Sequence, residues 1–343
     1  MRKSTHWTFA CLVGLLALVA ASSPKPGYHL VQRFAVGGEG GWDYMLVDEG
    51  ARRLYVTHGT RVVVLDADTG AVVGEIPDTS GVHGVALAPD LGRGFTSNGR
   101  SSTITIFDMK TLKPLSEVKS TGENPDAILY DPATRHVFAF NGRGRNATAI
   151  DAATGAVLGT LALDGKPEFA VSDGKGHIFS NLEDRSQIAV IDSRKLAVEK
   201  RWELAPCEEP SGMAFDRKRG RLFVGCANKM MAMVDTDSGR VVATVPIGEG
   251  VDANAFDPES DLAFASCGDG TVTAAHEDSS NKLTVVEVVP TQARSRTMAL
   301  DGKTHRLFLA GAKFGAAPPP TADQPRPRPP MEPGSFEVLV LGR

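Results

Sequence analysis

The sequence predicts an all-β chain that folds as a seven-bladed β-propeller with four-stranded blades. The first observation behind this prediction is a repeat, in which an aromatic residue inside a short apolar run returns every 40 to 44 residues. The seven aromatic anchors are Tyr55, Phe95, Phe138, Phe179, Phe223, Phe264 and Phe308. A period of this length with several short strands per unit is typical of propeller blades, which bury their sheet faces only by packing side by side into a ring.

The second observation is the order of elements within one unit, shown by residues 124–162. Short runs rich in Val, Ile, Phe and Ala predict strands near 126–130, 136–140, 147–151 and 156–162, with Gly, Asp, Asn or Pro between them. The turn before the outer strand carries Asp-x-x-Thr-Gly or Asp-x-x-Ser-Gly, as at 66–70, 151–155 and 235–239. An aspartate that caps its own turn and a glycine with positive φ explain this motif, so we predict a structural role for these aspartates and not a catalytic one.

The third observation concerns the two ends of the chain. The last unit supplies three strands and then stops at Arg343, while a strand-like segment at residues 28–36 precedes the first unit. We expect this N-terminal strand to complete the last blade, because such pairing removes an exposed sheet edge and closes the ring. Residues 22–343 would then form a single propeller domain.

Residues 1–21 have the pattern of a secretory signal peptide. Arg2 and Lys3 precede a short apolar run, and small residues at 19–21 offer a cleavage site. The apolar run is too short for a convincing membrane span. We therefore expect a periplasmic or secreted protein.

The charge balance bears on the class of partner. The chain has 37 Lys and Arg against 41 Asp and Glu, and loss of residues 1–21 would bring the net charge from −4 to about −6. The basic residues form no stripe interleaved with aromatics, so nucleic acid is not a favoured partner. We expect a monomer that binds a small polar ligand or a periplasmic protein.

Three cysteines follow the signal peptide, at 207, 226 and 267. Propeller topology brings the loop before an inner strand and the end of the next strand to the same face, which makes a Cys207–Cys226 disulfide our preferred pairing. Three buried free thiols are the open alternative. Covalent c-type haem is excluded because the sequence lacks Cys-x-x-Cys-His.

The repeated phrases at residues 54–70 (LYVTHGTRVVVLDADTG) and 95–111 (FTSNGRSSTITIFDMKT) resemble the YVTN-repeat propellers, the YncE-like family. The resemblance covers residues 28–343. It implies a secreted or periplasmic seven-bladed protein, mostly of undefined activity. The chain departs from the pattern in its sixth unit, where His276 replaces the usual Asp, and in its seventh, which carries an insertion.

The insertion spans residues 314–335 and contains eight prolines. It shows no apolar periodicity, which predicts an extended or disordered loop between the second and third strands of blade seven. A passive insertion is the favoured interpretation, because surface loops tolerate added length at little cost. A lid or a docking segment is the alternative.

Polar residues mark the start of the inner strands, about twelve residues before each anchor. Reading this position around the ring yields Asp43, His83, Asp126, Glu168, Ser211, Asp252 and Arg296. A structural repeat needs no polar residue here, so we predict a ligand site at one mouth of the channel. Residues after the second strands extend the predicted ligand-binding set by three members, His58, Asn98 and Asn141.

Three interpretations of this polar ring stay open, namely a solvated channel mouth, a ligand or cation site, and a catalytic site. If a metal binds, its predicted ligands are Asp43, Asp126, Glu168 and Asp252, and clustered carboxylates suit Ca²⁺ or another divalent cation. The enzyme alternative is a metal-dependent hydrolase or lactonase with His83 as base. We favour a binding propeller without a resident cofactor.

Overall fold

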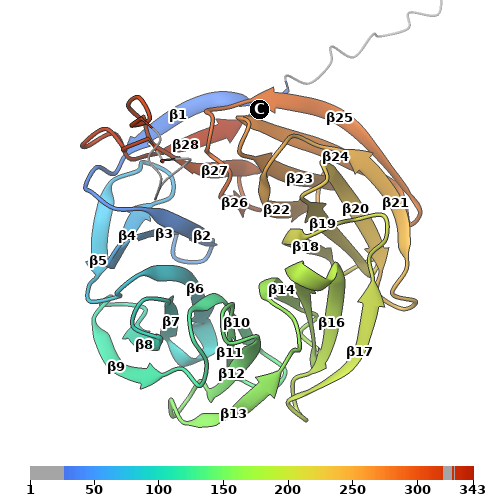
Figure 1. Cartoon of the computed structure of the whole chain (residues 1–343). Coiled ribbons are helices and arrows are strands. Elements are labelled where there is room, and N and C mark those ends of the chain that lie inside the picture. Colours follow the sequence, from blue (N-terminus) through green and yellow to red (C-terminus); the bar gives the residue numbers. More distant parts are fainter. Residues whose placement is uncertain (1–26, 320–326, 328) are drawn as a thin grey trace, which may run out of the picture.

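The computed structural model describes residues 27–319, 327 and 329–343. The predicted signal peptide at 1–21 lies outside the described residues. The described strands form seven four-stranded antiparallel sheets, and the sheets stand around a common axis like the blades of a propeller (Figure 1). The predicted fold is confirmed. The described part of the chain contains no helix of the length and apolarity needed to cross a membrane.

The strands follow one another from the axis outward in each blade. Blades 1 to 3 consist of β2 (Trp42–Asp48), β3 (Arg53–His58), β4 (Arg61–Asp66), β5 (Val72–Ile76); β6 (Val82–Ala88), β7 (Arg93–Asn98), β8 (Thr103–Asp108), β9 (Pro114–Lys119); and β10 (Pro125–Asp131), β11 (His136–Asn141), β12 (Asn146–Asp151), β13 (Val157–Ala162). Blades 4 to 6 consist of β14 (Pro167–Ser172), β15 (His177–Leu182), β16 (Gln187–Asp192), β17 (Ala197–Glu203); β18 (Pro210–Asp216), β19 (Arg221–Cys226), β20 (Met230–Asp235), β21 (Val241–Pro246); and β22 (Val251–Asp257), β23 (Leu262–Cys267), β24 (Thr271–Ser279), β25 (Lys282–Pro290). Blade 7 consists of β26 (Met298–Asp301), β27 (Arg306–Gly311), β28 (Glu337–Gly342) and the N-terminal β1 (His29–Ala35). Two short 3-10 turns, η1 (Pro89–Leu91) and η2 (Glu183–Arg185), follow β6 and β15.

The ring closes through the N-terminal strand, as predicted. β1 runs antiparallel to β28, from the pair His29 and Gly342 to the pair Ala35 and Glu337. The strand is exposed along most of its length, but Phe34 is buried in the core. Tyr28, just before the strand, is also buried and donates a hydrogen bond to the carbonyl of His305 at 3.0 Å.

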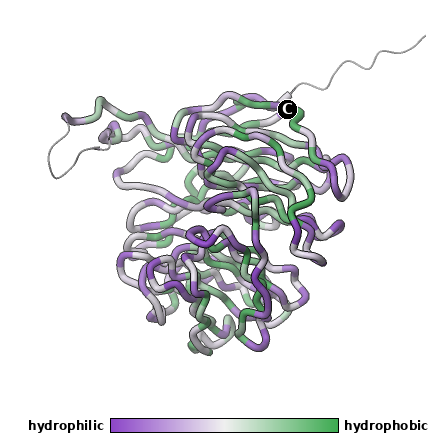
Figure 2. The backbone as a smooth tube through the Cα atoms, turned by 45° about the vertical axis from the view of Figure 1, so that its right-hand side comes forward, coloured by the Kyte–Doolittle hydropathy of each residue, from purple (hydrophilic) through white to green (hydrophobic). Residues whose placement is uncertain are grey.

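The hydrophobic core is divided among the blade interfaces. Seven clusters of buried residues each join two neighbouring blades, and all seven aromatic anchors are buried. In an oblique view, hydrophobic stretches follow the strands and many hydrophilic stretches lie at the turns (Figure 2). Each sheet is covered on both faces by its neighbours, so the middle strands are apolar on both sides. In β3, β4 and their equivalents, buried residues therefore follow one another and do not alternate with exposed ones.

The Asp-x-x-Thr-Gly turns have the structural role that the sequence predicts. The Asp66 carboxylate accepts hydrogen bonds from the backbone N–H and the hydroxyl of Thr69, both at 2.8 Å. Gly70 has a φ of 74°, and a Cβ at this position would also collide with the Phe34 ring of β1. The glycine is therefore required twice, by its backbone conformation and by the close approach of the neighbouring blade.

The proline-rich insertion is anchored at its base. Phe314 pairs with Met331 across a short bridge, and the N–H of Gly315 donates to the carbonyl of Pro330 at 2.9 Å. The Phe314 ring lies 6.2 Å from the Trp42 ring and under the Arg294 guanidinium, 4.6 Å from its centroid. The ends of the predicted loop are therefore packed on blades 1 and 7, through isolated apolar residues that carry no periodic signal.

The structure joins Cys207 and Cys226 by a disulfide bond within blade 5, and Cys267 is a buried free cysteine. Burial raises the pKa of the Cys267 thiol to about 12. For chain 22–343 we expect a thiol reagent to find one reactive group after denaturation without reductant and three with reductant. Three thiols without reductant would contradict the bond.

Candidate functional site: an acidic mouth at one end of the channel

The inner strands place their second residues at one end of the channel. These residues are Asp43 of β2, His83 of β6, Asp126 of β10, Glu168 of β14, Ser211 of β18 and Asp252 of β22. In each of these strands the pairing register shifts directly after the first residue. Such a β-bulge re-aims the side chains beside it, which explains why a polar residue is accommodated at this point of an otherwise apolar strand.

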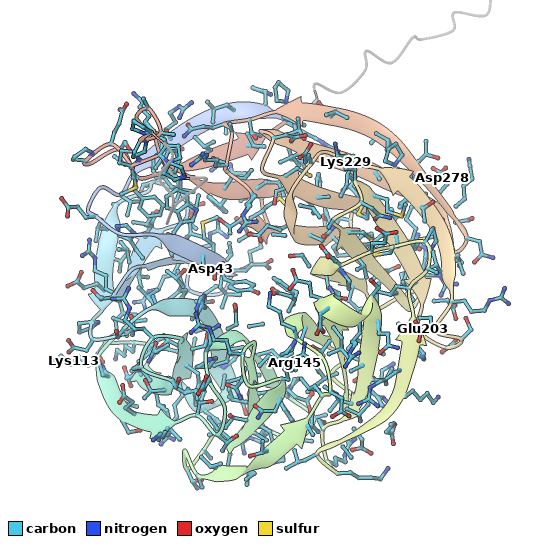
Figure 3. All side chains as sticks on the ribbon, in the orientation of Figure 1. Asp43, Lys113, Arg145, Glu203, Lys229 and Asp278 are labelled. Carbon is cyan, nitrogen blue, oxygen red and sulfur yellow. A yellow bond between two sulfur atoms is a disulfide. The ribbon has the colours of Figure 1, made fainter. Side chains whose placement is uncertain are left out.

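Blade 7 differs, because β26 begins only at Met298 and Arg296 lies in the segment before it. Its guanidinium still reaches the site, 3.5 Å from the Asp252 carboxylate. Figure 3 shows Asp43 beside the central axis, whereas Lys113 and Asp278 lie at the outer rim of the ring. The sequence register therefore predicts the convergence of these residues correctly, including the blade whose strand starts late.

His83 and two aspartates form the tightest group. The Nδ1 atom of His83 lies 2.6 Å from Oδ2 of Asp43 and 3.8 Å from Oδ1 of Asp126. One ligand atom from each of the three residues lies within 4.8 Å of the other two. A single metal ion could be held by such a set of one imidazole and two carboxylates.

This group differs from the predicted metal ligands. Glu168 and Asp252, which the sequence assigns to the same set as Asp43 and Asp126, each have a cation of their own. The Lys166 ammonium lies 2.7 Å from the Glu168 carboxylate and also contacts Glu183. The group of three therefore contains His83 in place of the predicted ligands Glu168 and Asp252. His83 comes from blade 2, which lies between the blades of Asp43 and Asp126 around the ring.

A cavity of about 490 Å³ occupies this end of the channel. Its lining contains seven carboxylates and two cations, namely Asp43, Asp126, Glu168, Glu183, Glu209, Glu249 and Asp252 with Lys166 and Arg296. We call this cavity, together with His83, the acidic mouth. Sequence reasoning missed Lys166 and Glu183, although Lys166 lies two residues before Glu168 and Glu183 follows the second strand of the same blade.

Burial shapes the electrostatics of the acidic mouth. It raises the pKa of Asp126 and of Asp252 to about 6, and His83 and Arg296 oppose these two shifts only in part. The pKa of Glu168 rises to about 7, through burial and then the charge of Asp126. Carboxylates that retain protons near neutral pH are short of compensating positive charge.

The His83–Asp43 pair behaves as a unit. Burial by itself lowers the pKa of His83, but the hydrogen bond to Asp43 and the charges of Asp126 and Asp43 raise it to about 9. The pKa of Asp43 is also raised, by burial above all, while the bond from His83 opposes the shift. The pair therefore keeps a proton through the neutral range.

Tyr44 forms the floor of the acidic mouth. Its ring centroid lies 5.3 Å from that of Phe169, and the residue lines both this cavity and a second one further along the channel. Burial and the surrounding carboxylates, Asp126 first among them, raise the pKa of the Tyr44 hydroxyl well above its usual value. The phenol is thus a neutral hydrogen-bond donor between the two cavities.

The three residues predicted after the second strands, His58, Asn98 and Asn141, do not line the acidic mouth. Asn98 and Asn141 are fully buried, and their side chains bond to threonines of their own blades. His58 is also buried and stacks on Phe336 with 4.4 Å between ring centroids. The two asparagine side chains thus turn into their own blades and away from the acidic mouth.

The acidic mouth makes a testable contribution to the pH dependence of stability. The pKa values of Asp126, Glu168, Asp252 and His83 are raised, so these groups bind more protons in the native state than in the unfolded state between about pH 4 and pH 9. Stability therefore falls as pH rises through this window. Glu277, whose pKa burial raises to about 7, adds an effect of the same sign.

We expect a higher unfolding free energy at pH 5.5 than at pH 8, measured by urea denaturation with a chelator present. Turn aspartates such as Asp66, whose pKa is lowered mainly by the bonds from Thr69, are ionised in both states across this range and leave it unaffected. Stability that rises from pH 5.5 to pH 8 would show that the carboxylates of the acidic mouth are not destabilised.

Sequence comparison finds no matching family model and no matching curated protein. Solved structures share the fold. A chain described under "Crystal Structure of Mitotic Checkpoint Complex" is 15% identical with a TM-score of 0.74, over 98% of this chain and 99% of that chain. "Crystal structure of RRP9 WD40 repeats" and "Structure of U3-55K" each match at 11% identity with a TM-score of 0.75, over 90% of this chain and 97% of theirs. At these identities the likeness establishes a WD40-like seven-bladed propeller fold and nothing about function.

Proposed function

We propose that this chain is a binding propeller whose acidic mouth takes a small cationic ligand. The observation that carries the proposal is the imbalance of charge around a cavity of about 490 Å³, where seven carboxylates face Lys166, Arg296 and the protonated His83. Burial raises the pKa of four of them, Asp43, Asp126, Glu168 and Asp252, and a bound cation would stabilise their ionised forms. A cavity of this size suits a metal ion with its waters or a small organic amine.

Two kinds of cation fit this chemistry. A divalent metal would be held by Asp43, His83 and Asp126, whose ligand atoms lie close together. An organic diamine would instead span the cavity, with one ammonium near Asp43 and Asp126 and the other near Asp252. The two differ in their need for the His83 imidazole, which binds a metal only in its neutral form.

A binding role is better supported than a hydrolase with His83 as base. A general base at neutral pH needs an imidazole that is free of its proton. Here the Asp43 and Asp126 carboxylates hold the proton on His83 and raise its pKa to about 9. The geometry therefore favours a charged, hydrogen-bonded histidine that orients neighbouring groups.

We further propose a secreted or periplasmic location and kinship with the YncE-like propellers. The support is the leader-like pattern of residues 1–21, the disulfide between Cys207 and Cys226 and the repeated blade phrases. Disulfides persist in oxidising compartments and are rare in the cytosol. Fractionation of cells that express the full chain would test the location, and recovery in the cytosol with an uncleaved N-terminus would contradict it.

Calorimetric titration of chain 22–343 tests the proposed ligand class, with Ca²⁺, Mn²⁺ and putrescine as probes. We expect one of them to bind at a stoichiometry of one, more tightly at pH 8 than at pH 5.5 because protonation removes the negative charge. His83→Asn should abolish binding of a metal and spare that of putrescine. The proposal fails if none of the three binds at millimolar concentration.

A further inference from the structure

A second cavity, of about 660 Å³, lies along the inner strands of blades 1 to 4. It begins below Tyr44, which also forms the floor of the acidic mouth, and continues to the far ends of β2, β6, β10 and β14. We call it the lower cavity. Its volume lies in the range of pockets that enclose small organic molecules.

The walls of the lower cavity are mostly apolar. They consist of backbone and side chains of residues such as Leu46, Val85, Leu87, Ile128, Phe169 and Val171. An apolar wall of this extent stabilises a ligand in proportion to the apolar surface that leaves water. The lower cavity therefore calls for a ligand with an apolar body, unlike the acidic mouth above it.

Arg217 is the cation among the lining residues. Its guanidinium lies over the Phe215 ring, 5.4 Å from the centroid, and donates a hydrogen bond to the carbonyl of Ser172 at 2.8 Å. Among the described residues no carboxylate lies within ion-pair distance of it. The remaining donors of this planar group are therefore available to an anion.

The carboxylates around the lower cavity already have partners. Asp48 accepts from the N–H of Ala51 at 3.0 Å, and Glu49 accepts from the N–H of Gly302 at 2.8 Å. Asp173, next to Ser172, is bonded to the ring of His177 at 3.0 Å. The charge of Asp173 acts on Arg217 and opposes the lowering of its pKa by burial, but the described residues form no ion pair with Arg217. Asp48 and Glu49 disfavour a ligand with a second negative charge.

The acidic mouth is too distant to repel an anion at Arg217. Arg217 follows the last residue of β18, whose start lies at the acidic mouth. A strand of this length spans roughly 20 Å at about 3.3 Å per residue. Charges so far apart are largely screened at physiological ionic strength, where the Debye length is about 8 Å.

We propose that the lower cavity binds an apolar organic molecule that carries one anionic group. The apolar body lies against the inner strands of blades 1 to 4, and the anion pairs with the guanidinium of Arg217. This site is separate from the acidic mouth, and its ligand is of the opposite charge.

Two matched fluorescent probes test this assignment. 8-Anilinonaphthalene-1-sulfonate is an apolar molecule with one sulfonate, and N-phenyl-1-naphthylamine is the same skeleton without it. For chain 22–343 we expect saturable binding of both at a stoichiometry of one. Arg217→Gln should weaken the sulfonate probe about tenfold, the effect of one charge-assisted hydrogen bond, and leave the neutral probe unchanged.

Two controls separate this site from the acidic mouth. Arg143→Gln, which removes a cation near the acidic mouth, and Asp126→Asn should change neither affinity. Equal weakening of both probes by Arg217→Gln would show a general change in the cavity and overturn the anion assignment. Failure of the sulfonate probe to saturate, or an affinity that Arg217→Gln does not alter, would also overturn the proposal.

Discussion

Deletion of residues 22–36 is expected to prevent the protein from folding into a stable monomer. The deletion leaves β28 as an unpaired edge and removes Tyr28 and Phe34 from the core clusters of blade 7. Loss of one buried aromatic side chain costs about 3–5 kcal/mol, so the two together approach the whole stability of a typical domain. Light scattering and urea denaturation of chain 37–343 should show aggregation and loss of the cooperative transition.

Point variants in β1 separate the packing contribution from the pairing. Phe34→Ala should lower the unfolding free energy by about 3–5 kcal/mol because the ring is buried against Phe308. Leu30→Ala is the matched control, since Leu30 is 41% exposed on the same strand, and its effect should stay within about 0.5 kcal/mol. A monomeric deletion variant with unchanged melting would contradict closure by β1.

The double variant Asp126→Asn, Asp252→Asn is expected to lose cation binding and to gain stability. Burial raises the pKa of both carboxylates to about 6, so each is ionised at a cost at pH 8. An amide of the same shape carries no such cost, and we expect a gain of roughly 1–3 kcal/mol in unfolding free energy. Calorimetry with the cation that binds wild type and urea denaturation without it measure the two effects.

Asp151→Asn is the matched control for a structural aspartate. The Asp151 carboxylate accepts bonds from the N–H and hydroxyl of Thr154 at 2.7 and 2.8 Å, and these bonds lower its pKa. This variant should lose roughly 1–2 kcal/mol of stability and bind the cation as wild type does. A double variant that unfolds would instead identify Asp126 and Asp252 as structural residues, and one that binds normally would remove the acidic mouth as the cation site.

Local patterning was enough to predict the architecture and the ring of inner-strand residues that converge at the acidic mouth. The aromatic anchors and the Asp-x-x-Thr-Gly turns return at a nearly constant spacing, and such a repeat predicts a ring of similar units. The extra strand at the N-terminus supplies the strand that the last unit lacks. Equivalent positions in successive blades must then meet at the axis. The sequence could therefore predict that Asp43, His83 and Asp126 lie close together, although they are 40 residues or more apart along the chain.

Contacts that depend on side-chain direction were decided only by the tertiary structure. Asn98 and Asn141 occupy equivalent positions after the second strands, yet both side chains turn into their own blades and away from the acidic mouth. The packing of Phe314 on Trp42 also depends on the tertiary structure, because no periodic pattern in the sequence indicates it.

The sequence by itself determined the number of blades, the closing strand and the register of the polar ring, because each depends on spacing along the chain. The tertiary structure alone decided that His83 pairs with Asp43, that Lys166 pairs with Glu168, and that Arg217 lies beside an apolar cavity without an ion pair to the described residues. These outcomes depend on distances between blades and on burial, and neither quantity is encoded in the spacing of residues within one repeat.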